Sequence, residues 1–534
     1  MFNKDFESID FISYRDQSLK LEDGIELVSR IWFPNNPGPW PALLMRQPYG
    51  REIASSITYP HPSWWASHGY LVIIQDVRGQ GDSQGEFKGF SQESSDTSQT
   101  HQWARSLKEC NGKLGTYGFS YQGFTQLVAL EGSTPPDCSA PAMTGLNEKD
   151  HWSCEGNAYW WHLGLAWGLQ LAALQAKRTN KIRAWQRIRG SLENGSYLIE
   201  GKELLKEHDP KGMAYQWLMK SNKQEESFTE HKPLTSWLKQ PMLLIGGWWD
   251  PHLTGIIDIY KQSLSAGGKP EIHIGPASHL KWWNEAYDIQ LNFFNLHLKG
   301  LKSTNKPRER KNLWNISTEE WISEKYKHNK EFIYWGLSSN GSACFAEQEG
   351  GLKRDKEGQG WLELVHDPWR PVPSIGGHLS QNPGYKDRND IDNRLDVATF
   401  TTNQVDNDLY IEGIPLLELF AHSDQKGFDL CVALSIVSKD KLKAKQISTG
   451  FLRIRGKEAL HKVKRKVLLQ PICASLKPSE HLRLSISGSC WPAIAINPGS
   501  EEIDCGPPGA KSLVTTIKIS LNQSKLQISP LLDE

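Results

Sequence analysis

The segment Gly118-Phe119-Ser120-Tyr121-Gln122-Gly123 constrains this chain more than any other. It places a serine between small residues, after a short expected strand and before residues 124–130, which we expect to form a helix. A nucleophile elbow needs this arrangement, because its strand-to-helix turn is too tight for bulky side chains and lifts the serine hydroxyl clear of the sheet. The usual elbow has its second glycine two residues after the serine, whereas here it comes three residues after. An ordinary turn therefore stays an equal alternative for the motif alone.

The bulk composition sets the broad class of the chain. At 534 residues it is too long for a single core, so we expect two or three domains. Lysine plus arginine and aspartate plus glutamate both total 61, and the zero net charge gives no reason to expect a nucleic acid or an anionic membrane as partner. The 22 tryptophans are unusually many. They indicate a lined pocket or a packed helical insertion, with simple core packing as the alternative.

Targeting signals and cysteine spacing indicate the compartment. Residues 1–7 contain early acids and no apolar core segment, so we expect no signal peptide. No apolar run approaches the roughly 18 residues that a membrane span needs. The eight cysteines are scattered without a Cys-x-x-Cys pair, which argues against a zinc site and is typical of reduced thiols. We therefore expect a cytoplasmic protein that does not associate with a membrane.

Short apolar segments predict a buried sheet in the first 145 residues and again after residue 240. Residues 25–33 alternate between apolar and polar side chains, as an exposed edge strand would. Continuous apolar runs indicate strands that are covered on both faces, as in a parallel sheet between layers of helices. These runs are residues 42–45, 70–75, 241–246 and 271–275.

The remaining sequence divides into a helical part and a β-rich part. Residues 146–240 are rich in tryptophan, then in lysine and arginine, with helical spacing; the stretch 163–176 predicts a buried helix. From about residue 305, turn-forming residues separate many short strand-like runs, which is typical of a sandwich or jelly roll. The expected boundaries are 1–145 and 241–305 for an α/β domain, 146–240 for an inserted helical cap and 306–534 for the β domain.

An elbow serine needs a histidine within hydrogen-bond reach and an acid that orients that histidine, because a free hydroxyl is scarcely ionised at neutral pH. In α/β-hydrolases the order along the chain is serine, acid, histidine, each on a loop at the carboxyl end of a strand. Asp250 follows the apolar run 241–246, and His279 follows the run 271–275. The 130 residues from Ser120 to Asp250 accommodate a cap, and the next 29 residues accommodate one strand–helix–strand unit.

Each of these residues alone has an ordinary explanation. An aspartate after a strand most often caps a helix, and a lone histidine is most often structural or on the surface. His252 is a second histidine near the expected acid, but it lies on the acid's own loop and would have to fold back to act as the base. The presence of all three residue types in the required order favours the catalytic interpretation.

Acyl transfer also requires donors for the oxyanion of the tetrahedral intermediate. The backbone N–H of Tyr121, directly after the serine, is one expected donor. Residues 45–50 follow an expected strand and offer a second, either a backbone N–H or the phenol of Tyr49. An ordinary half-buried tyrosine is the alternative for Tyr49 on its own.

With these residues in place, the chain resembles the cocaine esterase / X-prolyl dipeptidyl-peptidase family of serine hydrolases. The matching motifs are Arg-x-Pro-Tyr at 46–49, Asp-x-Arg-Gly-x-Gly-x-Ser-x-Gly at 76–85, Gly-x-Ser-Tyr-x-Gly at 118–123, Gly-Trp-x-Asp at 247–250 and Gly-Pro-x-x-His at 275–279. Residues 394–402 look like the start of the family's jelly roll and residues 480–498 like its end. The resemblance implies an α/β-hydrolase domain with an inserted helical cap, followed by a C-terminal all-β jelly-roll domain.

The resemblance also implies a role for each site residue. Ser120 would be the nucleophile, His279 the general base and Asp250 the acid that orients it. The phenol of Tyr49 and the N–H of Tyr121 would bind the oxyanion.

Two further features follow from the resemblance. Asp76 and Arg78 would form a structural, buried pair beside the elbow. Ala277 and the pair Leu280-Lys281 depart from the family's usual histidine loop, which implies a site shaped for a different substrate.

The expected reaction is acyl transfer to water on a small-molecule ester, an amide or a short peptide, with no metal or organic cofactor. An X-Pro dipeptidyl-peptidase is one alternative, since it needs an acid for a free α-amine and an apolar pocket for proline. The residues in the expected cap that suit this role are Glu148, Asp150, Glu155, Trp152, Trp160 and Trp161. A second alternative is a binding protein with an inactive hydrolase domain, whose jelly roll binds a ligand such as carbohydrate. The natural substrate and the question of a homodimer stay open.

Overall fold

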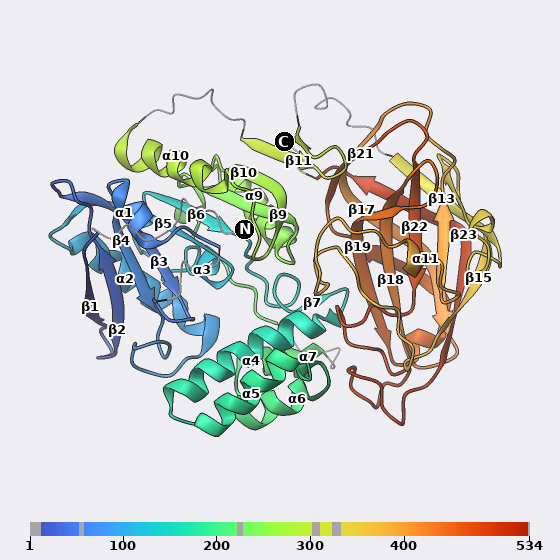
Figure 1. Cartoon of the computed structure of the whole chain (residues 1–534), viewed down its shortest axis with the longest axis horizontal. Helices are drawn as coiled ribbons and strands as arrows, with labels where there is room; N and C mark the ends of the chain where they lie inside the picture. The colour runs from blue at the N-terminus through green and yellow to red at the C-terminus, as the bar shows by residue number, and fades with distance from the viewer. Residues whose placement is uncertain (1–11, 53–57, 222–227, 302–309, 323–332, 532–534) are drawn as a thin grey trace.

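The computed structural model describes residues 12–52, 58–221, 228–301, 310–322 and 333–531. A ten-stranded sheet lies on one side of the molecule and an eleven-stranded β region on the other, with a group of helices below and between them (Figure 1). Segment 1–7, where we expect no signal peptide, lies outside the described residues. Within the described part of the chain, no helix is both long and apolar enough to cross a membrane.

The first sheet has the strand order β1-β2-β4-β3-β5-β6-β9-β10-β11-β12. Its strands are β1 (Tyr14–Lys20), β2 (Glu26–Trp32), β3 (Trp40–Gln47), β4 (Leu71–Asp76), β5 (Cys110–Phe119), β6 (Cys138–Ala142), β9 (Leu243–Trp249), β10 (Glu271–Ser278), β11 (Lys311–Asn315) and β12 (Glu320–Trp321). Neighbours from β4 to β11 pair in parallel. The prediction of an edge strand at residues 25–33 is wrong, because β1 pairs outside β2 and forms the edge.

Helices cover this sheet and leave one end of it open for a site. The helices that pack on it are α1 (Pro62–Ser67), α2 (Glu93–Ser106), α9 (Leu253–Ser265) and α10 (Ala286–Lys299), with a 3-10 turn η2 (Gly89–Gln92) before α2. Every residue of β4 is buried, as expected for a parallel strand between helix layers. Ligand sites in open α/β sheets lie at the carboxyl ends of the strands.

The helix expected over residues 124–130 is not formed. Helix α3 is a single turn, Tyr121–Phe124, and turns follow it. The side-chain amide of Gln126 donates hydrogen bonds to the carbonyl oxygens of Gly118 and Gln122, at 3.1 and 3.0 Å. The second of these bonds occupies the Gln122 carbonyl, which the backbone N–H of Gln126 would use if the helix continued.

A helical insertion separates β6 from β9. It comprises two short strands, β7 (Cys154–Glu155) and β8 (Ala158–Tyr159), and the helices α4 (Trp161–Arg178), α5 (Ile182–Asn194), α6 (Tyr197–His208), α7 (Met213–Ser221) and α8 (Thr235–Leu238). Helix α4 contains the stretch expected to be a buried helix and packs against α5, α6 and α7. The domain boundaries stay a prediction; β11 pairs with β10 in the first sheet, although it lies beyond the expected boundary at residue 305.

The second sheet forms the C-terminal jelly roll. Its strands are β13 (Ile333–Asn340), β14 (Gly351–Arg354), β15 (Gln359–His366), β16 (Val397–Thr401), β17 (Leu409–Ser423), β18 (Gly427–Val437), β19 (Ala444–Arg455), β20 (Val463–Leu468), β21 (Ile472–Leu476), β22 (His481–Ser487) and β23 (Thr515–Ser529), with short helical turns η4 (Glu347–Glu349), α11 (Asn389–Asp392) and η5 (Lys457–Leu460). Buried and half-buried residues alternate along most of β17, which indicates that one of its faces packs on the core.

The jelly roll also provides hydrogen-bond acceptors for the N-terminus of α4. The first N–H groups of a helix have no partner within the helix. Here the N–H groups of Trp161 and His162 donate to the carbonyl oxygens of Ala493 and Pro492, at 2.9 and 3.0 Å. The position of α4 therefore depends on contacts with both halves of the molecule.

Candidate active site

A cavity of about 320 Å³ lies between the carboxyl ends of the first sheet and helix α4. Its volume falls within the range of small-molecule sites, which is about 300–1,000 Å³. The described residues that line it are Tyr49, Thr58, Phe119, Ser120, Gln122, Trp152, Trp160, Leu163, Gly164, Ala166, Trp167, Gln170, His252, His279 and Leu280. Most of them are apolar or aromatic, so the cavity suits an uncharged ligand.

Ser120 lies between β5 and α3 in a backbone conformation that side-chain-bearing residues rarely adopt, with φ 59° and ψ −128°. Strain of this kind is typical of a nucleophile elbow. A Cβ atom at Gly123 would lie 2.8 Å from Cβ of Thr144 and 2.9 Å from the carbonyl oxygen of Ala142. The late glycine therefore lets α3 approach the end of β6 closely, and the Ser120 N–H reaches the Ala142 oxygen at 3.0 Å.

Asp250 and His279 come together at the ends of β9 and β10. The Oδ2 atom of Asp250 lies 2.6 Å from Nδ1 of His279, and the Asp250 side chain is fully buried. The other carboxylate oxygen accepts a hydrogen bond from the backbone N–H of His252 at 2.9 Å. Since Nδ1 donates to the carboxylate, Nε2 of His279 is left as the acceptor, and both His279 and Ser120 line the cavity.

Tyr49 follows β3 and places its phenol in the same cavity. The phenol oxygen accepts a hydrogen bond from Nε1 of Trp167 at 3.1 Å. Burial raises the pKa of Tyr49 to about 12, although hydrogen bonds with Trp167 and Ser120 oppose this shift. The phenol is therefore protonated at neutral pH and can act as a donor.

Tyr121 contributes its backbone at the site and its side chain elsewhere. Its N–H opens the single turn of α3, where the first N–H groups have no partner within a helix. Its phenol donates to Oε1 of Glu93, at the start of α2, at 2.8 Å. The second oxygen of Glu93 lies 2.8 Å from Nη1 of Arg46, and both of these side chains are almost completely buried.

His252 lines the cavity, and its backbone N–H donates a hydrogen bond to the acid. Its Nδ1 lies 2.6 Å from the carbonyl oxygen of His151, so Nδ1 carries the proton. Burial lowers the pKa of His252 to about 4, which keeps the imidazole neutral. Its ring centroid is 5.0 Å from that of His279. Because the ring of His279 contacts Asp250, the geometry favours His279 as the base.

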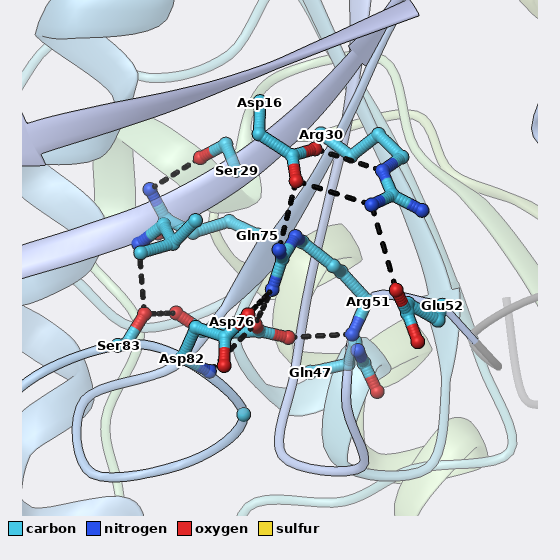
Figure 2. A network of polar contacts seen from close by, with 12 residues as sticks. Asp16, Ser29, Arg30, Gln47, Arg51, Glu52, Gln75, Asp76, Asp82 and Ser83 are labelled. Carbon is cyan, nitrogen blue, oxygen red and sulfur yellow. Dashed lines mark hydrogen bonds and ion pairs between the residues drawn. The ribbon is translucent and has the colours of Figure 1, made fainter.

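A network of charged side chains holds the loop that carries Tyr49 (Figure 2). The guanidinium of Arg51 contacts the carboxylates of Asp16, Asp76 and Asp82 at 2.8, 2.8 and 2.7 Å. The backbone N–H of Arg51 also donates to Oδ1 of Asp76 at 2.5 Å. Because Arg51 lies two residues after Tyr49, these contacts tie the loop to the end of β4.

The expected pair between Asp76 and Arg78 is therefore wrong. Arg78 forms ion pairs with Asp96 at 2.7 Å and with Asp23 at 2.5 Å. The Asp76 carboxylate turns the other way, because the N–H groups of Arg51 and Asp82 donate to it there.

The three acids considered for a free α-amine do not belong to the described residues that line the cavity. Glu148 accepts a hydrogen bond from Nε1 of Trp217 at 2.8 Å. Glu155 lies 2.5 Å from Nε2 of His378 in the jelly roll. Asp150 is exposed. Two of the acids thus have structural partners.

The tryptophans of the insertion are divided between the cavity and the core. Trp152 and Trp160 line the cavity, whereas Trp161 does not. Trp167 was not singled out in the sequence, although it both lines the cavity and contacts Tyr49. Leu163, Ala166, Trp167 and Gln170 all line the cavity at helical spacing. That spacing is the signal from which this face of α4 could have been found.

Two protein-family profiles match the chain. X-Pro dipeptidyl-peptidase (S15 family) matches residues 23–281. The X-Pro dipeptidyl-peptidase C-terminal non-catalytic domain matches residues 301–526. Among curated proteins, cocaine esterase from Rhodococcus sp. (strain MB1 Bresler) is 24% identical over 479 residues, which cover 82% of this chain and 83% of the relative.

Solved structures share the fold over nearly the whole chain. An aminopeptidase from the marine sediment archaeon Thaumarchaeota archaeon has a TM-score of 0.71 at 17% identity, covering 97% of this chain and 96% of the other. An α-amino acid ester hydrolase has a TM-score of 0.70 at 18% identity, covering 97% and 96%. A CocE/NonD family hydrolase from Staphylococcus aureus has a TM-score of 0.70 at 17% identity, covering 98% and 95%. The predicted fold class is thereby confirmed.

Proposed function

Because the chain belongs to the cocaine esterase / X-prolyl dipeptidyl-peptidase family of serine hydrolases, we propose that Ser120, His279 and Asp250 form its catalytic triad. The chain is a serine hydrolase that acts on ester or amide bonds. The contact of 2.6 Å between Asp250 and Nδ1 of His279, at the wall of the cavity that Ser120 also lines, is the observation that carries the proposal.

The reaction proceeds through an acyl-enzyme. Oγ of Ser120 attacks the carbonyl carbon while Nε2 of His279 takes its proton, and the oxyanion that forms accepts hydrogen bonds from the Tyr49 phenol and the Tyr121 N–H. The imidazolium, stabilised by Asp250, then gives its proton to the leaving alcohol or amine. A water deprotonated by His279 attacks the ester of Ser120 and releases the acid.

We propose that the substrates are uncharged acyl esters or amides rather than peptides with a free α-amine. A buried ammonium needs a carboxylate partner, and the described residues that line the cavity include no aspartate or glutamate. The aromatic and aliphatic lining supports an apolar acyl or leaving group.

The serine is tested by replacing Ser120 with alanine, with Ser67→Ala as a control at an exposed position. Ser120→Ala should abolish both turnover and labelling by a fluorophosphonate, and Ser67→Ala should preserve both. Labelling that survives in Ser120→Ala would refute the nucleophile.

The substrate class is tested by comparing short p-nitrophenyl esters with Gly-Pro-p-nitroanilide. We expect kcat/KM to be higher for the esters. A clear preference for Gly-Pro-p-nitroanilide would instead establish an X-Pro dipeptidyl-peptidase.

A further inference from the structure

We propose that Trp167 of helix α4 is a positioning residue that orients the phenol of Tyr49 toward the developing oxyanion. This inference rests on the proposed function, in which Tyr49 is an oxyanion donor. The observation behind it is the hydrogen bond of 3.1 Å from Nε1 of Trp167 to the Tyr49 oxygen. Both side chains line the same cavity as Ser120.

The chemistry of the two groups fixes the direction of this bond. An indole N–H is a donor only, so the phenol must be the acceptor and cannot direct its own proton toward Trp167. The hydroxyl proton of a tyrosine otherwise rotates to whichever acceptor is nearest. With one lone pair of the oxygen engaged by Trp167, the O–H is directed away from α4 and toward the Ser120 side of the cavity.

Trp167 is itself held in place by its neighbours. Its ring stacks on that of Trp217, with centroids 5.7 Å apart and planes 18° apart. The N–H of Trp217 donates to Oε2 of Glu148 at 2.8 Å, and Oε1 of Glu148 lies 3.0 Å from Nε2 of His231. Glu148 therefore anchors a tryptophan stack whose last member reaches the phenol, which gives this partly buried acid a role other than binding an amine.

The consequence is that the phenol donor of the oxyanion hole and the group that orients it come from different parts of the chain. Tyr49 comes from the loop after β3, and the group that orients it comes from the helical insertion. A group that only fills the pocket would affect substrate binding, whereas a group that orients an oxyanion donor affects the transition state and therefore kcat.

A double-mutant cycle in kcat tests the inference, using Trp167→Phe, Tyr49→Phe and the double variant. Trp167→Phe retains an aromatic ring, although a smaller one, and removes the N–H. We expect kcat to fall by about two- to tenfold with little change in KM, the range for one neutral hydrogen bond. Tyr49→Phe should lower kcat by about 10²–10³-fold. In the Tyr49→Phe background, Trp167→Phe should have no further effect.

Trp160→Phe is the matched control, because Trp160 also lines the cavity but its buried Nε1 has no hydrogen-bond partner among the described residues. We expect its effect on kcat to be the same in both backgrounds. If Trp167→Phe behaves in the same way, the inference is refuted while the role of Tyr49 stands. If Tyr49→Phe alone has near-normal kcat, the proposed role of Tyr49 fails and the inference fails with it. The melting temperature of each variant verifies that it is folded.

Discussion

Replacement of Glu93 tests whether the buried ion pair beside the Tyr121 phenol stabilises the elbow. The side chains of Arg46 and Glu93 are 1% and 0% exposed, and their charged atoms lie 2.8 Å apart. Glu93→Gln preserves the shape of the side chain and an oxygen that can still accept from Tyr121. It removes the charge that compensates the buried guanidinium. Removal of one partner from a buried ion pair costs about 3–5 kcal/mol, a large part of the 5–15 kcal/mol that is typical of a folded protein.

The assay is hydrogen exchange at the amides of α2 and of the elbow, because it reports the local free energy of opening in a chain with several domains. A loss of 3–5 kcal/mol corresponds to exchange that is about 10²–10⁴ times faster. Tyr121→Phe removes only the phenol contact and should cost about 1.5–3 kcal/mol. The triple variant Arg46→Met/Glu93→Leu/Tyr121→Phe removes both charges together with the phenol that Glu93 accepts from, and it should recover most of the loss. A change below about tenfold for Glu93→Gln would refute the reasoning.

Three further predictions concern the acid, the late glycine and a buried histidine. Asp250→Asn should lower kcat about 10⁴-fold by favouring the wrong tautomer of the base; a loss below tenfold in ester hydrolysis would contradict this role. Gly123→Ala places a methyl group 2.8 Å from Thr144, so it should destabilise by about 1–3 kcal/mol and slow fluorophosphonate labelling, and unchanged labelling would exclude a strained approach. Burial lowers the pKa of His101 to about 3, whereas the pKa of an unfolded histidine is about 6.5. Between these two values the unfolded chain binds a proton that the folded chain does not, so the stability of the fold decreases as the pH falls. His101→Phe should therefore reduce the loss of melting temperature between pH 7 and pH 4, whereas replacement of the exposed His461 by glutamine should not.

Patterns along the sequence were sufficient to predict those candidate site residues that directly follow parallel strands. Asp250 and His279 each come after a continuous apolar run, and such runs locate the ends of β9 and β10 because both faces of those strands are covered. Parallel pairing then brings the two loops to one end of the sheet. The fold class followed from the same runs together with the change of texture near residue 305.

Contacts between distant segments could not be predicted from patterns along the sequence. The partner of Asp76 depends on the path of the loop after β3, which carries Arg51 to it. The contact of Trp167 with Tyr49 depends on how the insertion folds back over the sheet. The end of α3 depends on side-chain bonds of Gln126 that compete with the helix. None of these has a periodic signal, because each is decided by geometry between elements rather than within one.

The capping of α4 by the jelly roll also determines when the site can assemble during synthesis. The carbonyl groups of Pro492 and Ala493 that receive the first N–H groups of α4 are translated about 330 residues after the helix itself. At ribosomal rates of about 5–20 residues per second, this interval is on the order of twenty seconds to a minute. A nascent chain thus contains Ser120 and His279 well before the carbonyl groups that cap α4, the helix that bears Trp167, have been synthesised. We therefore expect hydrolytic activity to require synthesis of the chain at least through residue 493, and a chain truncated before Pro492 to lack this support for α4.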